Sequence, residues 1–277
     1  MTRFAPSPTG YLHLGHAFAA LKAVEGADRF LLRIEDIDRA RSREAFVTAI
    51  FEDLRWLGLA WEEPVLRQSL RGGAYRAALD ALAARGLIYP CFCTRKEIAD
   101  EIARAAEAPQ GPDGPIYPGT CRHLADDERR RRIAAGDSFA LRLDAAKAAG
   151  LTGPLVFEEK GQGPAGEHGT IRVAPLLSGD VVLARKDMPA AYHLAVVVDD
   201  AHQGITRVTR GEDLFAATHV QRLLQALLGL AVPQYAHHRL ILDAQGRKFS
   251  KRDRAATLRE LHMAGASPAS IRARLGL

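Results

Sequence analysis

The sequence has few of the residues that brace small secreted proteins or anchor membrane proteins. Its 277 residues include 3 cysteines, 3 methionines and 2 tryptophans, and only 6% are aromatic. An odd number of cysteines argues against a disulfide framework. No apolar run approaches the roughly 18 residues of a membrane-spanning helix, and residues 1–6 lack the apolar stretch of a signal peptide. We therefore expect a cytoplasmic protein with no membrane partner.

The chain also lacks a strong charge of one sign. It has 38 Lys and Arg against 33 Asp and Glu, a formal net charge of +5 and a pI of about 9.3. This modest positive charge permits a nucleic acid partner without requiring one. The hydrophobic share of 47% and the charged share of 26% are close to globular averages, which excludes disordered, collagen-like and coiled-coil chains.

Strand and helix patterns alternate along much of the chain. Phe30–Ile34 is a short apolar run typical of a buried strand, and apolar residues recur at helical spacing between Phe46 and Leu57. Thr94 and Glu97 form the pattern of a capping box that opens a helix. Such alternation predicts an α/β fold with a parallel sheet. The expected strands are 30–34, 180–185, 205–210 and 238–242, and the expected helices are 46–57, 75–85, 94–107 and 213–228, with a helix or helix–strand junction at 190–198.

A segment near the N-terminus has the features of a phosphate site. Residues 3–16 read RFAPSPTGYLHLGH, so His13, Gly15 and His16 stand where a helix begins. Helix N-termini favour anions, and an imidazole N–H can donate to an oxygen as charge develops on it. Two capping histidines in a turn are the simpler interpretation of this segment alone.

A second segment lies far away in the sequence. Residues 248–252 read KFSKR, with Lys248 and Lys251 on either side of Ser250 in a polar turn. Mobile ammonium groups can close over a triphosphate and neutralise it in the transition state. A solvated basic loop would be the simpler interpretation if this segment stood alone.

Together, HLGH and KFSKR resemble the HIGH and KMSKS signatures of class I aminoacyl-tRNA synthetases. RFAPSPTG (3–10), LRIEDID (32–38), YHLAVVVDD (192–200) and GITRVTRGEDL (204–214) further resemble glutamyl-tRNA synthetase. The resemblance covers residue 3 to about residue 252. It implies a Rossmann-type catalytic domain with catalytic and ATP-binding side chains in the two signatures. The catalytic set is His13, His16, Lys248 and Lys251, and the ATP-binding set is Gly15, His16, Ser250 and Lys251.

Glutamate also fits the side chains on chemical grounds. A dicarboxylate that carries an ammonium group is complemented by two arginines and one carboxylate, because arginine binds carboxylates in a bidentate manner. The sequence offers such a set, and the resemblance places it around the amino acid. Which arginine binds which carboxylate stays open, as does the alternative that Glu35 and Asp36 only pair with nearby arginines. The expected glutamate-binding residues are Arg3, Phe4, Ala5, Pro6, Ser7, Glu35, Tyr192 and Arg210.

The three cysteines, Cys91, Cys93 and Cys121, lie close together in the sequence. Structural zinc takes four tetrahedral ligands, so either Tyr117 or His123 would complete a site, while three buried thiols are the alternative. The chain resembles a branch of the family in which C-x-C and Y-x-x-x-C form the site, which implies Tyr117. We therefore expect one structural Zn²⁺, and Mg²⁺ bound with ATP.

Only 25 residues follow KFSKR, enough for one or two helices. A glutamyl-tRNA synthetase needs a larger helical region there to read the anticodon. Together with the cysteine pattern, this resembles the glutamyl-Q tRNA(Asp) synthetases. That family activates glutamate with ATP without needing tRNA and attaches it to queuosine at the wobble position of tRNA(Asp). The alternatives are a truncated glutamyl-tRNA synthetase that charges a tRNA 3′ end and a non-enzymatic tRNA-binding paralogue.

The expected organisation follows from these segments. A first half of the Rossmann-type catalytic domain (1–88) precedes an inserted, acceptor-like subdomain with the zinc site (89–178). A second half (179–242) leads to the KMSKS-like loop and a short helical tail (243–277), with no anticodon-binding domain. The expected partners are ATP, L-glutamate and tRNA(Asp) carrying queuosine, and a monomer is the default.

Overall fold

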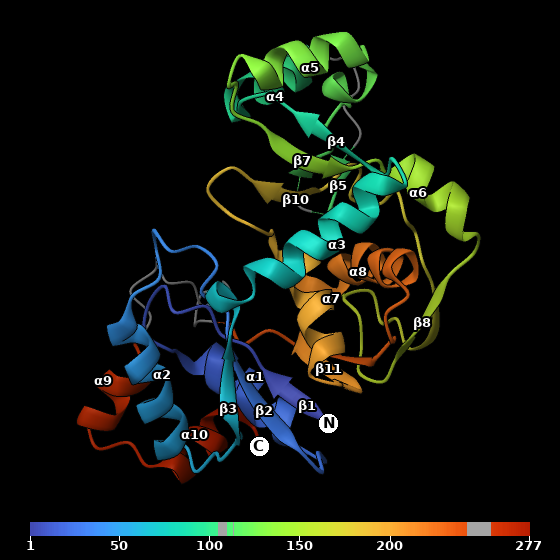
Figure 1. The fold of residues 1–277 in the computed structure, drawn as a ribbon. Coiled ribbons are helices and arrows are strands. Elements are labelled where there is room, and N and C mark those ends of the chain that lie inside the picture. Colours follow the sequence, from blue (N-terminus) through green and yellow to red (C-terminus); the bar gives the residue numbers. More distant parts are fainter. Residues whose placement is uncertain (105–109, 113, 243–255) are drawn as a thin grey trace.

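A computed structural model of the chain describes residues 1–104, 110–112, 114–242 and 256–277 (Figure 1). Its strands are β1 (Thr2–Phe4), β2 (Phe30–Ile34), β3 (Glu62–Arg67), β4 (Ile88–Cys91), β5 (Gln110–Gly111), β6 (Gly114–Pro115), β7 (Ala140–Leu143), β8 (Val156–Glu159), β9 (Gly169–Arg172), β10 (Val182–Arg185), β11 (Arg207–Gly211) and β12 (Gln234–His238). Its α-helices are α1 (Leu14–Val24), α2 (Glu44–Trp56), α3 (Gly72–Ala84), α4 (Arg95–Arg104), α5 (Asp126–Ala134), α6 (Ala145–Thr152), α7 (Tyr192–His202), α8 (Phe215–Leu228), α9 (Leu258–Met263) and α10 (Pro268–Leu275).

The central layer is built from parallel strands. β1, β2 and β3 form one sheet in that order, and β11, β12 and β8 form another, with β9 antiparallel at its edge. The two sheets meet at Met1, whose carbonyl oxygen accepts hydrogen bonds from the backbone N–H groups of Thr206 (3.1 Å) and Arg207 (3.2 Å). The parallel sheet with helical connections agrees with the predicted α/β fold.

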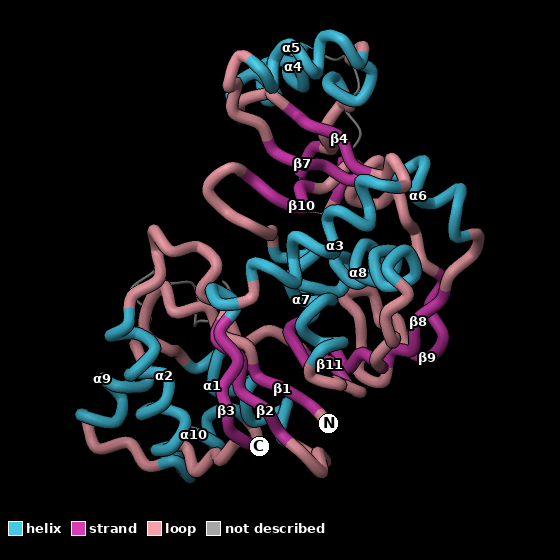
Figure 2. The backbone as a smooth tube through the Cα atoms, viewed as in Figure 1, coloured by secondary structure: helices cyan, strands magenta, loops and turns pink. Residues whose placement is uncertain are grey.

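A separate sheet, which is antiparallel throughout, is formed mostly by the residues between these two groups of strands. Its order is β10-β7-β4, and α4 and α5 lie beside it at the top of Figures 1 and 2. We assigned 180–185 to the second half of the catalytic domain, yet β10 within it pairs with β7 of the insertion. The domain boundaries at 88, 178 and 242 stay predictions.

Residues 256–277 fold back on the first half. They form α9 and α10, which agrees with the predicted one or two helices. Leu258, Ile271 and Leu275 are buried in the same apolar cluster as side chains of α1, β2 and α2. At about 25 cal/mol per Å² of buried apolar surface, each such side chain contributes about 2 kcal/mol.

Local signals gave most helices correctly. Thr94 and Glu97 exchange the two hydrogen bonds of a capping box at α4 (2.7 and 3.2 Å), although the predicted end near 107 lies outside the described residues. The predicted strand at 238–242 is wrong, because β12 pairs in parallel with β11 with Gln234 opposite Arg207, and it ends at His238. Among the described residues, no helix is long and apolar enough to cross a bilayer.

Candidate active site

A cavity of about 410 Å³ opens at the carboxyl ends of β1 and β2. Ligands of open α/β sheets bind in such a crevice, where the strand order changes direction. Six of the residues predicted to bind glutamate line it, while Arg3 and Arg210 are absent from the lining. The lining residues are Phe4, Ala5, Pro6, Ser7, His16, Glu35, Tyr192 and Leu214.

Arg3 is fixed beside the cavity by a buried carboxylate. Its Nε and Nη2 atoms donate to the two oxygens of Asp200 at 2.9 and 3.3 Å. Arg33, which is fully buried, donates to the same carboxylate at 2.7 Å and to Glu35 at 3.4 Å. Burial opposes ionisation of Asp200, but the two arginines outweigh it and lower the pKa of Asp200 to about 2.

Glu35 connects this charged group to the cavity. Burial raises its pKa, although Arg33 and Arg3 act in the opposite direction. Asp36 accepts from the Arg67 guanidinium at 3.2 Å. The predicted alternative of carboxylates paired with arginines is therefore present, and Glu35 lines the cavity at the same time.

Arg210 is held by a different set of partners. Its guanidinium donates to His237 Nε2 (3.1 Å), to the hydroxyl of Tyr192 (3.2 Å), to Gln221 Oε1 (2.8 Å) and to Thr218 Oγ1 (2.7 Å). Tyr192 begins α7 and lines the cavity, so it links Arg210 to the cavity wall.

His13 and His16 open α1 as a pair of rings. His13 caps the helix: its Nδ1 accepts from the backbone N–H of Gly15 (3.1 Å), and its own backbone N–H donates to His16 Nδ1 (3.2 Å). Because both Nδ1 atoms accept, each neutral ring carries its proton on Nε2. A Cβ atom on Gly15 would lie 3.1 Å from the His13 ring, so the ring would have to shift slightly to admit a larger residue there. The pair thus combines the predicted cap with two Nε2–H donors.

The KFSKR segment, with Lys248, Ser250 and Lys251, lies outside the described residues. The chain that follows it returns to the histidines. Thr257 forms a β-bridge with His13, and the backbone N–H of Leu258 donates to the carbonyl of Leu12 at 2.8 Å. The described part after the second signature therefore adjoins the first.

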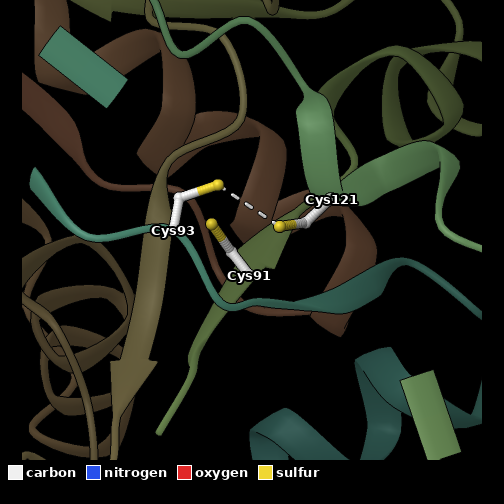
Figure 3. A group of neighbouring side chains, drawn as sticks. All are labelled: Cys91, Cys93 and Cys121. Carbon is white, nitrogen blue, oxygen red and sulfur yellow. Dashed lines mark hydrogen bonds between the residues drawn. The ribbon is translucent and has the colours of Figure 1, made fainter. Parts of the chain in front are cut away.

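The three cysteines converge on one point (Figure 3). Their sulfur atoms all lie within 4.8 Å of one another, and Cys91 and Cys121 are buried. The Tyr117 hydroxyl lies 3.3 Å from the Cys91 sulfur and 3.6 Å from the Cys93 sulfur. His123 is absent from this group of candidate metal ligands among the described residues.

The cluster has the chemistry of a cation site. Burial, the largest cause, together with the neighbouring Cys121 and Cys91 raises the pKa of the Cys93 thiol to about 12, although the hydrogen bond with Tyr117 acts in the opposite direction. A bound cation would favour the thiolates that burial disfavours. Three close sulfur atoms and one phenol oxygen therefore fit a metal with soft ligands.

Several residues of the site were not predicted from the sequence. Arg33 interrupts the apolar run FLLRI. Because a charge in a buried strand needs a partner, the sequence alone could have indicated that Arg33 forms a buried ion pair. Asp200 belongs to a segment that carried the resemblance, without a role assigned to it. Glu159 and His237 gave no signal, because their contact depends on the pairing of distant strands.

The chain belongs to the family described as tRNA synthetases class I (E and Q), catalytic domain, which matches residues 1–275. It is therefore a ligase of the aminoacyl-tRNA synthetase type. It is 53% identical to a Rhodobacter capsulatus protein named glutamyl-Q tRNA(Asp) synthetase, over 100% of both chains. A Nocardia farcinica protein of the same name is 46% identical, with 99% of this chain and 82% of that one covered.

A solved relative agrees with the fold. A glutamate tRNA ligase from Elizabethkingia meningosepticum, crystallised in complex with its amino acid, superposes with a TM-score of 0.73 at 29% identity. The match covers 91% of this chain and 51% of that one, so this chain spans about half the length of that ligase.

Proposed function

We propose that the protein activates L-glutamate with ATP, without needing tRNA, and transfers the glutamate to queuosine at the wobble position of tRNA(Asp). The observation that carries the proposal is the cavity at the carboxyl ends of β1 and β2. It combines Ser7, Glu35 and Tyr192 with His16 of the HLGH segment, so an amino acid and a phosphate chain can meet there. The names of the two bacterial relatives support the choice of RNA acceptor.

In the first step, the glutamate α-carboxylate attacks the α-phosphorus of ATP in line. A P–O bond to the carboxylate forms as the bond to pyrophosphate breaks, which gives glutamyl-adenylate. Glu35 accepts hydrogen bonds from the ammonium group of the substrate glutamate. Arg3 and Arg210 bind the two carboxylates of the substrate. The Nε2–H groups of His13 and His16 donate to phosphate oxygens as charge develops on them.

The second signature and a metal ion complete the phosphate site in this proposal. Lys248 and Lys251 approach the phosphates together with Ser250, while Gly15 leaves room for the ligand beside the histidines. Mg²⁺ bound with ATP would supply positive charge that offsets the charge on the phosphates.

In the second step, a hydroxyl of the queuosine cyclopentenediol attacks the carbonyl carbon of the adenylate. The new ester bond forms as the bond to AMP breaks, and the adenylate phosphate accepts the hydroxyl proton. In this proposal the RNA approaches through a second cavity of about 570 Å³, and the presence of Tyr192 in the walls of both cavities supports this. Its wall includes Arg41, Arg95, Arg142 and Arg185, which suit phosphate contacts. Unpaired bases can stack on aromatic rings there.

The cysteine cluster would hold one structural Zn²⁺, with Cys91, Cys93, Cys121 and Tyr117 as ligands. The cluster brings the end of β4 together with the segment before α5, and all four of these side chains fall within the predicted insertion (89–178). A tetrahedral zinc site with four protein ligands has no open position, so its role is to hold these segments together.

The decisive experiment supplies ATP, labelled glutamate and tRNA(Asp) prepared with and without queuosine. Label confined to the anticodon-loop fragment, and only in the queuosine-containing sample, is the expected result. Label on the 3′-terminal adenosine would instead support a glutamate–tRNA ligase, the activity named for a Methylococcus capsulatus relative that is 41% identical. If the protein catalyses no glutamate-dependent pyrophosphate exchange, that result would support a non-enzymatic tRNA-binding protein.

A further inference from the structure

Three adjacent parallel strands carry a row of buried polar side chains toward the glutamate cavity. Glu159 ends β8, His237 lies on β12 and Arg210 lies on β11. The register places Arg210 opposite His237, so both side chains project from the same face of the sheet. Glu159 and His237 have fully buried side chains. A buried charge is stable only where it is paired, so the hydrogen-bond partners of these three side chains must account for their burial.

The row has a single consistent hydrogen-bond direction. The Nε–H of Arg210 donates to His237 Nε2 (3.1 Å), which must therefore be unprotonated. The proton of the ring is then on Nδ1, which donates to Glu159 Oε2 at 2.5 Å. Burial lowers the pKa of His237, although Glu159 acts in the opposite direction. The lowered pKa favours the neutral ring.

Glu159 is itself fixed by the backbone. Its Oε1 accepts from the backbone N–H of His237 (2.9 Å) and of Gly161 (2.8 Å). A Cβ atom on Gly161 would lie 2.0 Å from the carbonyl oxygen of His237, so only glycine allows this approach. The carboxylate therefore cannot rotate away without breaking three hydrogen bonds.

The two arginines near the cavity differ in how their charge is balanced. Arg3 donates to both oxygens of the Asp200 carboxylate, whereas all four bonds of Arg210 go to neutral acceptors. Arg210 thus keeps a positive charge to which no carboxylate of the described residues is directly bonded. A substrate carboxylate gains from that charge more than a carboxamide does, because charge-assisted hydrogen bonds are roughly twice as strong.

We propose that His237, anchored by Glu159, is a positioning residue that orients Arg210 for the side-chain carboxylate of glutamate and so favours glutamate over glutamine. This inference rests on the proposed function, since it assigns a role in binding the same substrate. His237 touches no substrate in this scheme and acts through Arg210.

The test compares His237→Gln with His219→Gln. Both histidines are buried and pack against Phe215, but His219 Nδ1 accepts from the backbone N–H of Ala174, and His219 is not among the described hydrogen-bond partners of Arg210. Glutamate-dependent pyrophosphate exchange gives KM for glutamate, KM for ATP and kcat. We expect KM for glutamate to rise about tenfold in His237→Gln, the scale of one misplaced charged hydrogen bond, with KM for ATP unchanged. The preference for glutamate over glutamine should fall by a similar factor, and His219→Gln should resemble the wild type.

Equal effects of both substitutions, or equal rises in KM for glutamate and for ATP, would overturn the positioning role. If His237→Gln does not fold, Glu159→Gln, which keeps the shape of the carboxylate, replaces it with the same expectation. Nitrogen-15 NMR of the wild type is independent of any variant: a protonated Nε2 on His237 would also overturn the proposal. A wild type without glutamate-dependent exchange would instead refute the proposed function itself.

Discussion

Asp200 is shared by two buried arginines, so replacing it with asparagine tests the charge balance beneath the cavity. The substitution keeps the shape of the side chain and removes its charge. Arg3 and Arg33, both buried, then lose the carboxylate that binds them at 2.9 and 2.7 Å. The change should therefore destabilise the fold and displace the two arginine side chains whose charges act on Glu35.

Two estimates bracket the size of the effect. The pKa of Asp200, about 2 against an ordinary 3.8, corresponds to about 2 kcal/mol at ~1.4 kcal/mol per pH unit. Breaking a buried ion pair by removing one partner costs about 3–5 kcal/mol, because the remaining charge stays buried. We expect Asp200→Asn to lower the free energy of unfolding by about 2–5 kcal/mol, a large part of the 5–15 kcal/mol typical of folded proteins.

Asp53→Asn is the matched control, because it is expected to act in the opposite direction. Asp53 is buried, and its Oδ2 accepts no hydrogen bond from the described residues. Burial raises the pKa of Asp53 to about 6, so its charge is unfavourable at pH 7. An asparagine there removes this charge and should raise the free energy of unfolding. The gain should be only about 1 kcal/mol, because the buried amide still needs hydrogen-bond partners.

Urea unfolding followed by tryptophan fluorescence measures both variants. The lowered pKa of Asp200 means that its contribution is complete above about pH 4 and disappears as pH falls toward 2. The raised pKa of Asp53 means that its penalty appears as pH rises through about 6. An Asp200→Asn protein within about 0.5 kcal/mol of the wild type, the usual range of surface substitutions, would refute this reasoning, as would equal shifts of the same sign in both variants.

Three further substitutions test other parts of the site. Gly15→Ala places a methyl group 3.1 Å from the His13 ring, so kcat of pyrophosphate exchange should fall about tenfold or more with KM for glutamate unchanged; an unchanged kcat would contradict the role of the ring position. Cys93→Ser removes one thiolate, and atomic absorption should find clearly less zinc per chain than in the wild type, whereas equal zinc would exclude Cys93 as a ligand. Arg185→Ala should leave exchange intact, weaken binding of tRNA and reduce the slope of log affinity against log salt by about 1; parallel losses in exchange and transfer would argue against a phosphate contact.

Features that depend on neighbours in the sequence were predictable. The capping pair Thr94 and Glu97 and the apolar run at 30–34 act within a few residues, so their patterns survive in the fold. Ala5–Ser7 leave β1 as one continuous segment, and they line the cavity together. The cysteines converge because the C-x-C pair needs only one partner segment, which Tyr117 and Cys121 supply.

Features that depend on strand register were not predictable. The segment around Glu158 and Glu159 is short and polar, so nothing in it distinguishes an exposed carboxylate from a fully buried one. The wrong strand at 238–242 followed the apolar run Leu240–Leu242. In the fold, the residues of β12 that form hydrogen bonds with β11 are Gln234–His238, which precede this run, and Leu242 is exposed. Long-range pairing decided both cases.

The return of α9 and α10 to the first half has a consequence for biosynthesis. Leu258, Ile271 and Leu275 fill the apolar cluster shared with α1 and α2, so those helices keep an uncovered face while the intervening chain is being translated. Contacts between distant segments slow folding, and exposed apolar surface promotes aggregation of partly made chains. The nascent protein therefore completes its earliest core only after these late helices have left the ribosome.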